Sequence, residues 1–209
     1  MRRTALAVGL ALLGLIWGGP LISTWRGSFA SHMLAHMGVV ALAAPLIAIG
    51  LSNYSRSWRI PGWAPIIASL VELAVVWAWH MPEMRLLAET STFVTAIEQA
   101  MFLVAGLLVW IACLHQPPHD MRPAAAGAFG LLFTSIHMTL LGALLSLSPR
   151  PLYGEGTVTC FGLELSANQD QALGGVLMLL VGAVVYLAGA LWLFARLLRE
   201  PPAISTGHP

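Results

Sequence analysis

Long apolar runs recur along this chain, and only short breaks separate them. About 20 consecutive apolar residues form a helix that crosses a hydrocarbon core about 30 Å thick. The chain has 209 residues, of which 58% are hydrophobic and 9% are charged, whereas a soluble domain carries about a quarter charged residues. We therefore expect an all-α fold: a polytopic transmembrane helix bundle, forming a single transmembrane domain over residues 1–209, in contact with the lipid bilayer.

The breaks between the apolar runs set the expected helix boundaries. They fall at Gly18-Gly19-Pro20, Ser52-Asn53, Pro61-Gly62, Met81-Pro82, Pro117-Pro118 and the polar stretch 148–171. The runs between them predict about six membrane helices, at 4–20, 32–51, 63–80, 92–114, 124–147 and 172–196. Arg2 and Arg3 before the first run are also typical of a signal peptide. Because bulky Leu21 and Trp25 follow in place of a cleavage site, we expect a membrane helix.

The arginines indicate the orientation in the membrane. All ten basic residues are arginines, and short cytoplasmic loops of membrane proteins are enriched in basic residues. With the N-terminus in the cytoplasm, seven arginines lie inside and three outside, namely Arg26, Arg85 and Arg150. This bias predicts that both termini are cytoplasmic, and it places Cys113 and Cys160 on opposite sides, where they do not pair. The arginines form no basic stripe, so no nucleic-acid partner is expected.

Ionisable side chains inside the predicted helices gather at one depth. Such residues are costly in a membrane and usually mark function. With the orientation above and a rise of about 1.5 Å per residue, the candidates lie between the outer surface and the midplane: His32, His36, His80, Glu98, His137 and Asp170. Glu72 lies about 12 Å below His80, and it is either a structural carboxyl or part of a relay. The pattern predicts one site in the outer half of the bilayer.

The residue types in this group favour a metal ion. His32 and His36 are four residues apart, so both imidazoles lie on one helix face and can reach one ion. Nearby methionines, with the histidines, favour soft or borderline metals, above all copper; they are Met33, Met37, Met81, Met84 and Met138. Glu98 or Asp170 would complete the shell or orient an imidazole. Two simpler interpretations remain open: interhelical hydrogen bonds for the histidines and packing for the methionines.

Several separated segments together resemble a known family. They are His32-Met33-Leu34-Ala35-His36-Met37 with Ala44-Pro45-Leu46, Trp79-His80-Met81-Pro82, Glu98 with Phe102, Leu141-Gly142-Ala143-Leu144-Leu145 before Pro151-Leu152-Tyr153, and Asp170-Gln171 with Gly174-Gly175 and Met178. Their order and spacing resemble the membrane-embedded CtaG family of cytochrome c oxidase assembly factors over residues 32–190. This chain has Glu98-Gln99 where many members have Glu-His.

The resemblance implies a multi-pass protein of the bacterial inner membrane that matures a haem–copper oxidase. Its expected partner is the cytochrome c oxidase catalytic subunit, and its expected cofactor or cargo is copper. No nucleotide-binding glycine loop, nucleophile elbow or H-E-x-x-H motif is present, so no catalytic activity is expected.

Two other functions remain open on the sequence. A b-type cytochrome would use two histidines on different helices as axial haem ligands, such as His36 and His137. The His32–His36 pair argues against it, because two histidines of one helix cannot hold a haem from opposite faces. A small transporter would use Glu72 and Glu98 as an ion or proton relay. No inverted repeat supports that alternative.

Overall fold

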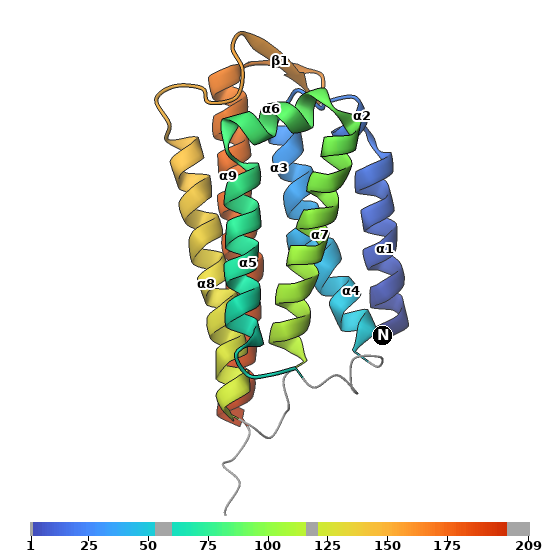
Figure 1. Cartoon of the computed structure of the whole chain (residues 1–209), viewed down its shortest axis with the longest axis vertical. Coiled ribbons are helices and arrows are strands. Elements are labelled where there is room, and N and C mark those ends of the chain that lie inside the picture. Colours follow the sequence, from blue (N-terminus) through green and yellow to red (C-terminus); the bar gives the residue numbers. More distant parts are fainter. Residues whose placement is uncertain (1, 53–59, 116–120, 200–209) are drawn as a thin grey trace, which may run out of the picture.

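The computed structural model describes residues 2–52, 60–115 and 121–199. Long helices lie side by side with similar directions, and a β-hairpin covers one end of the bundle (Figure 1). The elements that run along the bundle are α1 (Arg2–Gly18), α5 (Ala64–Trp79), α7 (Thr92–Leu114), α8 (Met121–Ser146), α9 (Ala167–Arg199) and one span made of three consecutive segments. These three segments are α3 (Phe29–Met37), η1 (Gly38–Ala43) and α4 (Ala44–Leu51). Near the hairpin lie α2 (Pro20–Ser23), α6 (Pro82–Thr90), β1 (Thr157–Cys160) and β2 (Leu163–Ser166).

The predicted all-α membrane bundle is confirmed. Within the described residues, five helical segments are long and apolar enough to cross a membrane. A sixth candidate is the pair α5 and α6, which bend by 72° at the break between Trp79 and Pro82. The first turn of α1 and the last turn of α9 lie at the end of the bundle opposite the hairpin (Figure 1). We call the other end the hairpin end; that it faces the cell exterior stays a prediction from the arginines.

Capping side chains set the helix boundaries more sharply than the apolar runs do. The predicted helix 92–114 matches α7, but α9 begins at Ala167 and not at 172. The Ser166 amide donates to Gln169 Oε1 at 3.0 Å, and the Gln169 amide donates to Ser166 Oγ at 3.3 Å. This reciprocal pair is a capping box. The stretch 148–171, predicted as a polar loop, therefore contains the antiparallel β1–β2 hairpin and the first turn of α9.

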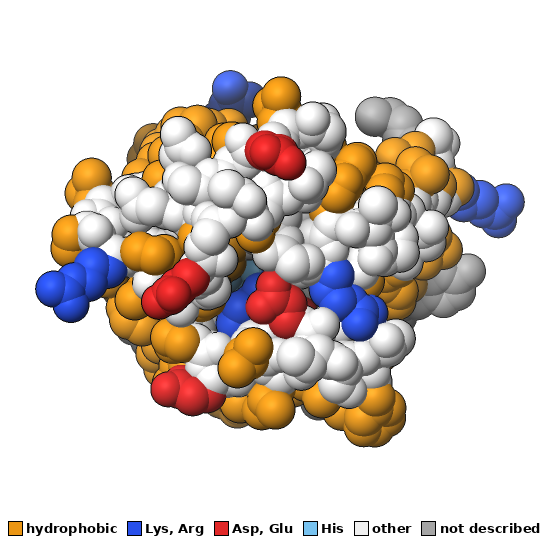
Figure 2. All heavy atoms as spheres, turned by 90° about the horizontal axis from the view of Figure 1, so that it is seen from above, with side chains coloured by type: hydrophobic (Ala, Val, Ile, Leu, Met, Phe, Trp, Pro, Cys, Tyr) orange, Lys and Arg blue, Asp and Glu red, His pale blue; other side chains and the backbone are white. Residues whose placement is uncertain are grey.

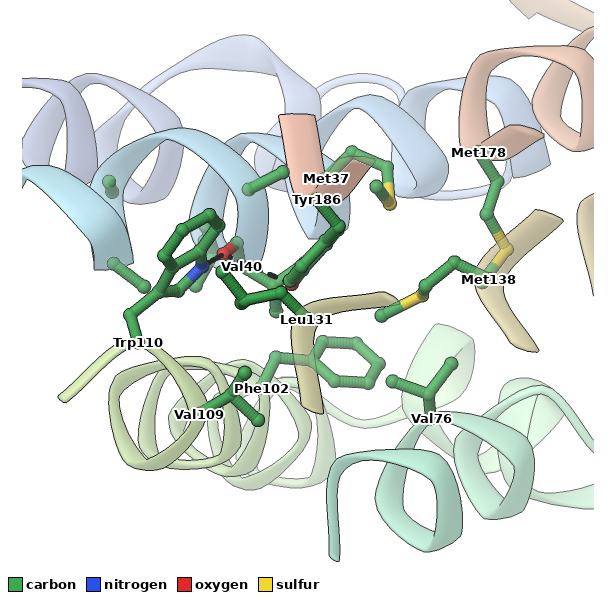
Figure 3. Packing of buried hydrophobic residues seen from close by; sticks show 14 of the residues in the cluster. Met37, Val40, Val76, Phe102, Val109, Trp110, Leu131, Met138, Met178 and Tyr186 are labelled. Carbon is green, nitrogen blue, oxygen red and sulfur yellow. Dashed lines mark hydrogen bonds between the residues drawn. The ribbon is translucent and has the colours of Figure 1, made fainter. Parts of the chain in front are cut away.

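The second span changes its helical register half-way along. In η1 the Ala44 amide donates to Val39 O, one residue further back than in an α-helix. The carbonyl of Val40 would then need the amide of residue 45, which is Pro45 and has no N–H. Trp110 Nε1 donates to this carbonyl at 2.9 Å, and the Tyr186 hydroxyl lies 3.3 Å from it (Figure 3). The free carbonyl thus fastens α7 and α9 to the middle of this span.

Small residues let α8 and α9 pack closely. A Cβ atom on Gly142 would lie 2.7 Å from the carbonyl oxygen of Gly175, and one on Gly175 would lie 2.6 Å from the Ser146 amide. Gly142 and Gly175 therefore let the two helices approach closely. The two cysteines, Cys113 and Cys160, are free and buried. The breaks predicted at Asn53 and at Pro117-Pro118 lie outside the described residues.

Candidate metal site

Three histidines from two helices meet in the half of the bundle nearest the hairpin. His32 and His36 lie on one face of α3, with ring centroids 6.4 Å apart, and His80 ends α5. The His80 ring centroid is 5.7 Å from that of His32 and 5.3 Å from that of His36. All three side chains are buried. We call His32, His36 and His80 the histidine cluster.

Nitrogen atoms of this cluster lack hydrogen-bond partners. Among the described residues, no partner is found for either ring nitrogen of His36, or for Nε2 of His32 and of His80. Each buried polar atom left unpaired costs about 1–3 kcal/mol, so several in one place point to a ligand that completes them. The other nitrogen of His80, Nδ1, lies 2.6 Å from the Val76 carbonyl oxygen. Because a carbonyl only accepts, Nδ1 carries the proton and Nε2 offers a lone pair.

The ring spacing suits a shared ion, although the nitrogens do not converge on one point. A metal bound to an imidazole at about 2.0–2.1 Å lies about 3.2 Å from the ring centroid, so two rings on one ion have centroids about 5–6.5 Å apart. The three separations, 5.3, 5.7 and 6.4 Å, lie within that range. Across the part of the chain that the structure describes, no three His, Cys, Asp or Glu side chains form a ready metal shell. Ligation therefore requires the rings to turn.

A buried carboxylate adjoins the cluster. Glu98 projects from α7, and its Oε2 lies 3.7 Å from Nδ1 of His32. Neither carboxylate oxygen has a partner at strict hydrogen-bond geometry within the described residues, and the neighbouring Gln99 amide interacts with the carboxylate more loosely. One turn further along α7, the ring of Phe102 packs 4.1 Å from that of His36. Glu98 is therefore available as an oxygen ligand. Phe102 covers the cluster on the side away from the hairpin end.

Arg85 lies between the cluster and the hairpin end. It is only 3% exposed, and its Nη2 donates to the carbonyl oxygen of Arg26 at 2.8 Å. The same nitrogen lies 3.7 Å from Oε1 of Glu89. Arg85 lines a cavity of about 10 Å³ together with His32 and Glu98, so its charge acts directly on the site. On the surface of the hairpin end, acidic and basic side chains lie side by side near the middle (Figure 2).

The other two predicted ligands differ in their surroundings: Asp170 is engaged elsewhere, whereas His137 lies close enough to His36 for their charges to interact. Asp170 of α9 accepts hydrogen bonds from the Ser28 hydroxyl at 2.7 Å and from the amides of Phe29 and Ala30 at 2.5 and 3.2 Å. Both of its oxygens are thereby used to hold the start of α3, one turn before His32. The ring of His137 on α8 lies 5.7 Å from that of Phe133 and has no partner for either nitrogen among the described residues. The histidine cluster and the adjoining Glu98 thus account for four of the six predicted residues.

The methionines next to the histidines turn away from the cluster. A Cβ atom on Gly174 of α9 would lie 2.9 Å from Met33 Cγ, and one on Gly182 would lie 3.7 Å from Met37 Cε. Met37 and Met138 both border Gly182, within the apolar core shown in Figure 3. Met33, Met37 and Met138 therefore fill the space above the α9 glycines, a packing role that flexible methionine suits.

A family model described as the cytochrome c oxidase caa3 assembly factor (Caa3_CtaG) matches residues 1–200. The chain belongs to this family. The resemblance seen over residues 32–190 is thus confirmed, and the match also includes α1. Comparisons with curated proteins and with solved structures gave no match.

Two further residues of this Caa3_CtaG protein support the cluster and were not predicted to do so. The Tyr153 hydroxyl, in the loop after α8, donates to the carbonyl oxygen of His80 at 2.6 Å. The Tyr153 ring stacks on Phe29 at 4.2 Å. Burial raises the pKa of Tyr153 above its usual value, so the hydroxyl stays protonated and remains a donor. Arg85 was considered only for orientation, although its position five residues after His80 was visible in the sequence.

The capping role of Asp170 can be separated from a ligand role. We expect Asp170→Asn to lower the free energy of unfolding by about 2–3 kcal/mol, because hydrogen bonds to a buried charge are lost. Gln169→Ala, at an exposed neighbour that caps only α9, should cost about 1 kcal/mol or less. Thermal unfolding of both variants in detergent measures the difference. An Asp170→Asn protein that keeps wild-type stability and loses bound metal would contradict the capping role.

Proposed function

We propose that this Caa3_CtaG protein holds one copper ion in the histidine cluster and delivers it to the catalytic subunit of a haem–copper oxidase. The observation that carries the proposal is the set of buried imidazole nitrogens without partners, with Nε2 of His80 kept as a lone-pair donor. Family membership supplies the link to oxidase assembly. Copper is here the cargo, and the protein makes and breaks no covalent bond of a substrate, so it is not an enzyme.

The donor set suits copper. Neutral imidazoles with one adjoining carboxylate bind borderline metals, and copper(II) stands highest among the divalent ions of the first transition row. Arg85 places a positive charge beside the same cavity, which weakens the hold on any cation. A carrier needs such moderation, because it must release its ion to the next protein. His32, His36, His80 and Glu98 are the proposed ligands, and Asp170 positions the first two through the start of α3.

The location follows from the arginine bias. We propose a multi-pass protein of the bacterial inner membrane with both termini in the cytoplasm. The hairpin end, with the cluster beneath it, then faces the periplasm. Copper would reach the cluster from that side.

A haem is the competing cofactor, and the space near the cluster disfavours it. The cavity that reaches His32 and Glu98 has a volume of about 10 Å³, which is room for about one water molecule or an ion. The rings of His36, His80 and Phe102 are packed within 6.2 Å of one another. A porphyrin would need these side chains to separate.

Metal analysis of the detergent-purified protein, with an absorption spectrum of the same sample, tests the proposal. We expect about one copper per chain after loading with copper, and no Soret band. A Soret band with two-histidine ligation would favour the cytochrome. No bound copper at all, from a protein that unfolds cooperatively, would contradict the carrier role.

A further inference from the structure

A pocket of about 450 Å³ lies at the end of the bundle opposite the hairpin. Residues of α4, α7, α9 and the first turn of α1 line it. A volume of about 300–1,000 Å³ is usual for small-molecule sites. None of the described residues that line this pocket belongs to the histidine cluster, so it is a separate candidate site.

The mouth of the pocket, formed by the helix ends, is basic. Arg2 at the start of α1 and Arg196 in the last turn of α9 both line it, and none of its described lining residues is acidic. Ser52, which follows α4, also lines the mouth, and its buried hydroxyl oxygen has no hydrogen-bond partner among the described residues. A buried hydroxyl left unpaired is costly. Two guanidinium groups and this hydroxyl therefore favour an anionic ligand that accepts hydrogen bonds.

His115 also lies at the mouth, but it adds no charge. Burial lowers the pKa of His115, the hydrogen bond to the Ile111 carbonyl oxygen opposes this effect, and the charge of Arg2 adds to it. The imidazole is therefore neutral at physiological pH, and we assign it no ligand role. The positive charge of the mouth comes from the two arginines.

The interior of the pocket is apolar and runs along the bundle. Pro45 lies seven residues before Ser52 on α4. Gly189 has the same spacing from Arg196 on α9, so the pocket extends about 10 Å from its mouth. A Cβ atom on Gly189 would lie 3.1 Å from ring atoms of Trp110. This tryptophan therefore closes the inner end.

The pocket also opens sideways, toward the lipid. Two of its lining side chains, Ile49 of α4 and Trp192 of α9, are 43% and 55% exposed on the outer surface of the bundle. In a membrane such side chains contact acyl chains, which are as apolar as they are. A free phosphate ion would be stabilised only at the mouth, because the apolar interior offers it no hydrogen-bond donor.

We propose that this pocket binds one anionic phospholipid, with its phosphate group at Arg2, Arg196 and Ser52 and an acyl chain along the apolar interior. Basic pockets between membrane helices on the cytoplasmic side bind anionic headgroups, and the arginine bias predicts that this end is cytoplasmic. A phospholipid fits better than a free anion, because only a lipid fills both the basic mouth and the apolar interior. The inference does not depend on the copper-carrier function.

Native mass spectrometry of the detergent-purified protein tests the proposal by counting bound lipids. We expect about one phosphatidylglycerol per chain, bound at least about tenfold more tightly than phosphatidylcholine. Glycerol 3-phosphate, which carries the phosphate group without acyl chains, should not bind at concentrations at which phosphatidylglycerol saturates the protein. Equal binding of the two phospholipids would overturn the proposal, and so would glycerol 3-phosphate that binds as well as phosphatidylglycerol.

Paired arginine variants locate the lipid on the protein. The double variant Arg2→Gln, Arg196→Gln should bind phosphatidylglycerol at least about tenfold more weakly, because each arginine near the membrane surface attracts anionic lipid. The matched control Arg3→Gln, Arg199→Gln removes the same charge from the same two helices, at exposed residues that do not line the pocket. The control should bind as the wild type does. Ile49→Trp, which fills the interior and keeps both arginines, should also weaken binding if the first variant does not fold. Wild-type affinity in either folded pocket variant would overturn the proposal.

Discussion

Protein carrying His36→Ala is expected to retain less than about one-tenth of the copper bound by the wild-type protein. His36 contributes the only cluster ring with two unpartnered nitrogens, and it lies within 6.4 Å of both other rings. Loss of a residue that merely supports a ligand weakens metal binding by about 10–100-fold, and loss of a ligand from a three-histidine site should cost at least as much. Metal analysis of the purified variant, after loading and desalting, measures the effect.

His115→Ala is the matched control for this variant. His115 follows the last turn of α7, at the end opposite the hairpin, and its Nδ1 lies 3.1 Å from the Ile111 carbonyl oxygen. The His115→Ala variant should keep the copper content of the wild-type protein. Thermal unfolding of His36→Ala shows whether the bundle is intact, because the imidazole also packs against Phe102. A folded His36→Ala protein with full copper content would exclude His36 as a ligand.

The double variant His36→Ala, His80→Ala should lower the activity of the haem–copper oxidase as far as deletion of this protein does. The catalytic polypeptide should still reach the membrane, because a metal donor acts on assembly and not on synthesis. If the donor only raises the local copper concentration, excess external copper should partly restore activity by mass action. If transfer needs a docked complex, restoration should be weak. Oxidase activity and immunodetection of its catalytic subunit in the same membranes measure both quantities.

The level of the double variant in the membrane must match that of the wild type for this comparison. His115→Ala again serves as the control and should support normal oxidase activity. Normal activity in the double variant would refute copper donation. It would favour a purely structural role for this Caa3_CtaG protein in oxidase assembly.

The apolar runs predicted the helices well because a membrane imposes one length on every span. Boundaries were missed where polar side chains decide them. Ser166 and Gln169 start α9 inside a stretch that hydropathy alone assigns to a loop. Strands of four residues, such as Thr157–Cys160, are too short for their alternation to stand out.

The sequence predicted how deep each residue lies along its helix. It predicted only in part which way each side chain points around the helix axis. The rise per residue put Asp170 and His32 near one level, yet it could not show that Asp170 faces the first amides of α3. The four-residue spacing of His32 and His36 did fix a common face. The direction of Met33 and Met37 toward α9 depends on which helix lies beside them. That neighbour is set by tertiary packing, which a single sequence does not record.

The π-helix η1 fixes how the two halves of the second span are turned relative to each other. A single extra residue in a helix turns everything before it by about 100° relative to everything after it. Without that insertion, the helix face bearing His32 and His36 would point about a quarter-turn away from His80, with α4 held in place. The direction of the half that bears His32 and His36 is thus set at Gly38–Ala43, while α4 packs against α1. A one-residue deletion in η1 would redirect the histidines without changing any residue of the cluster.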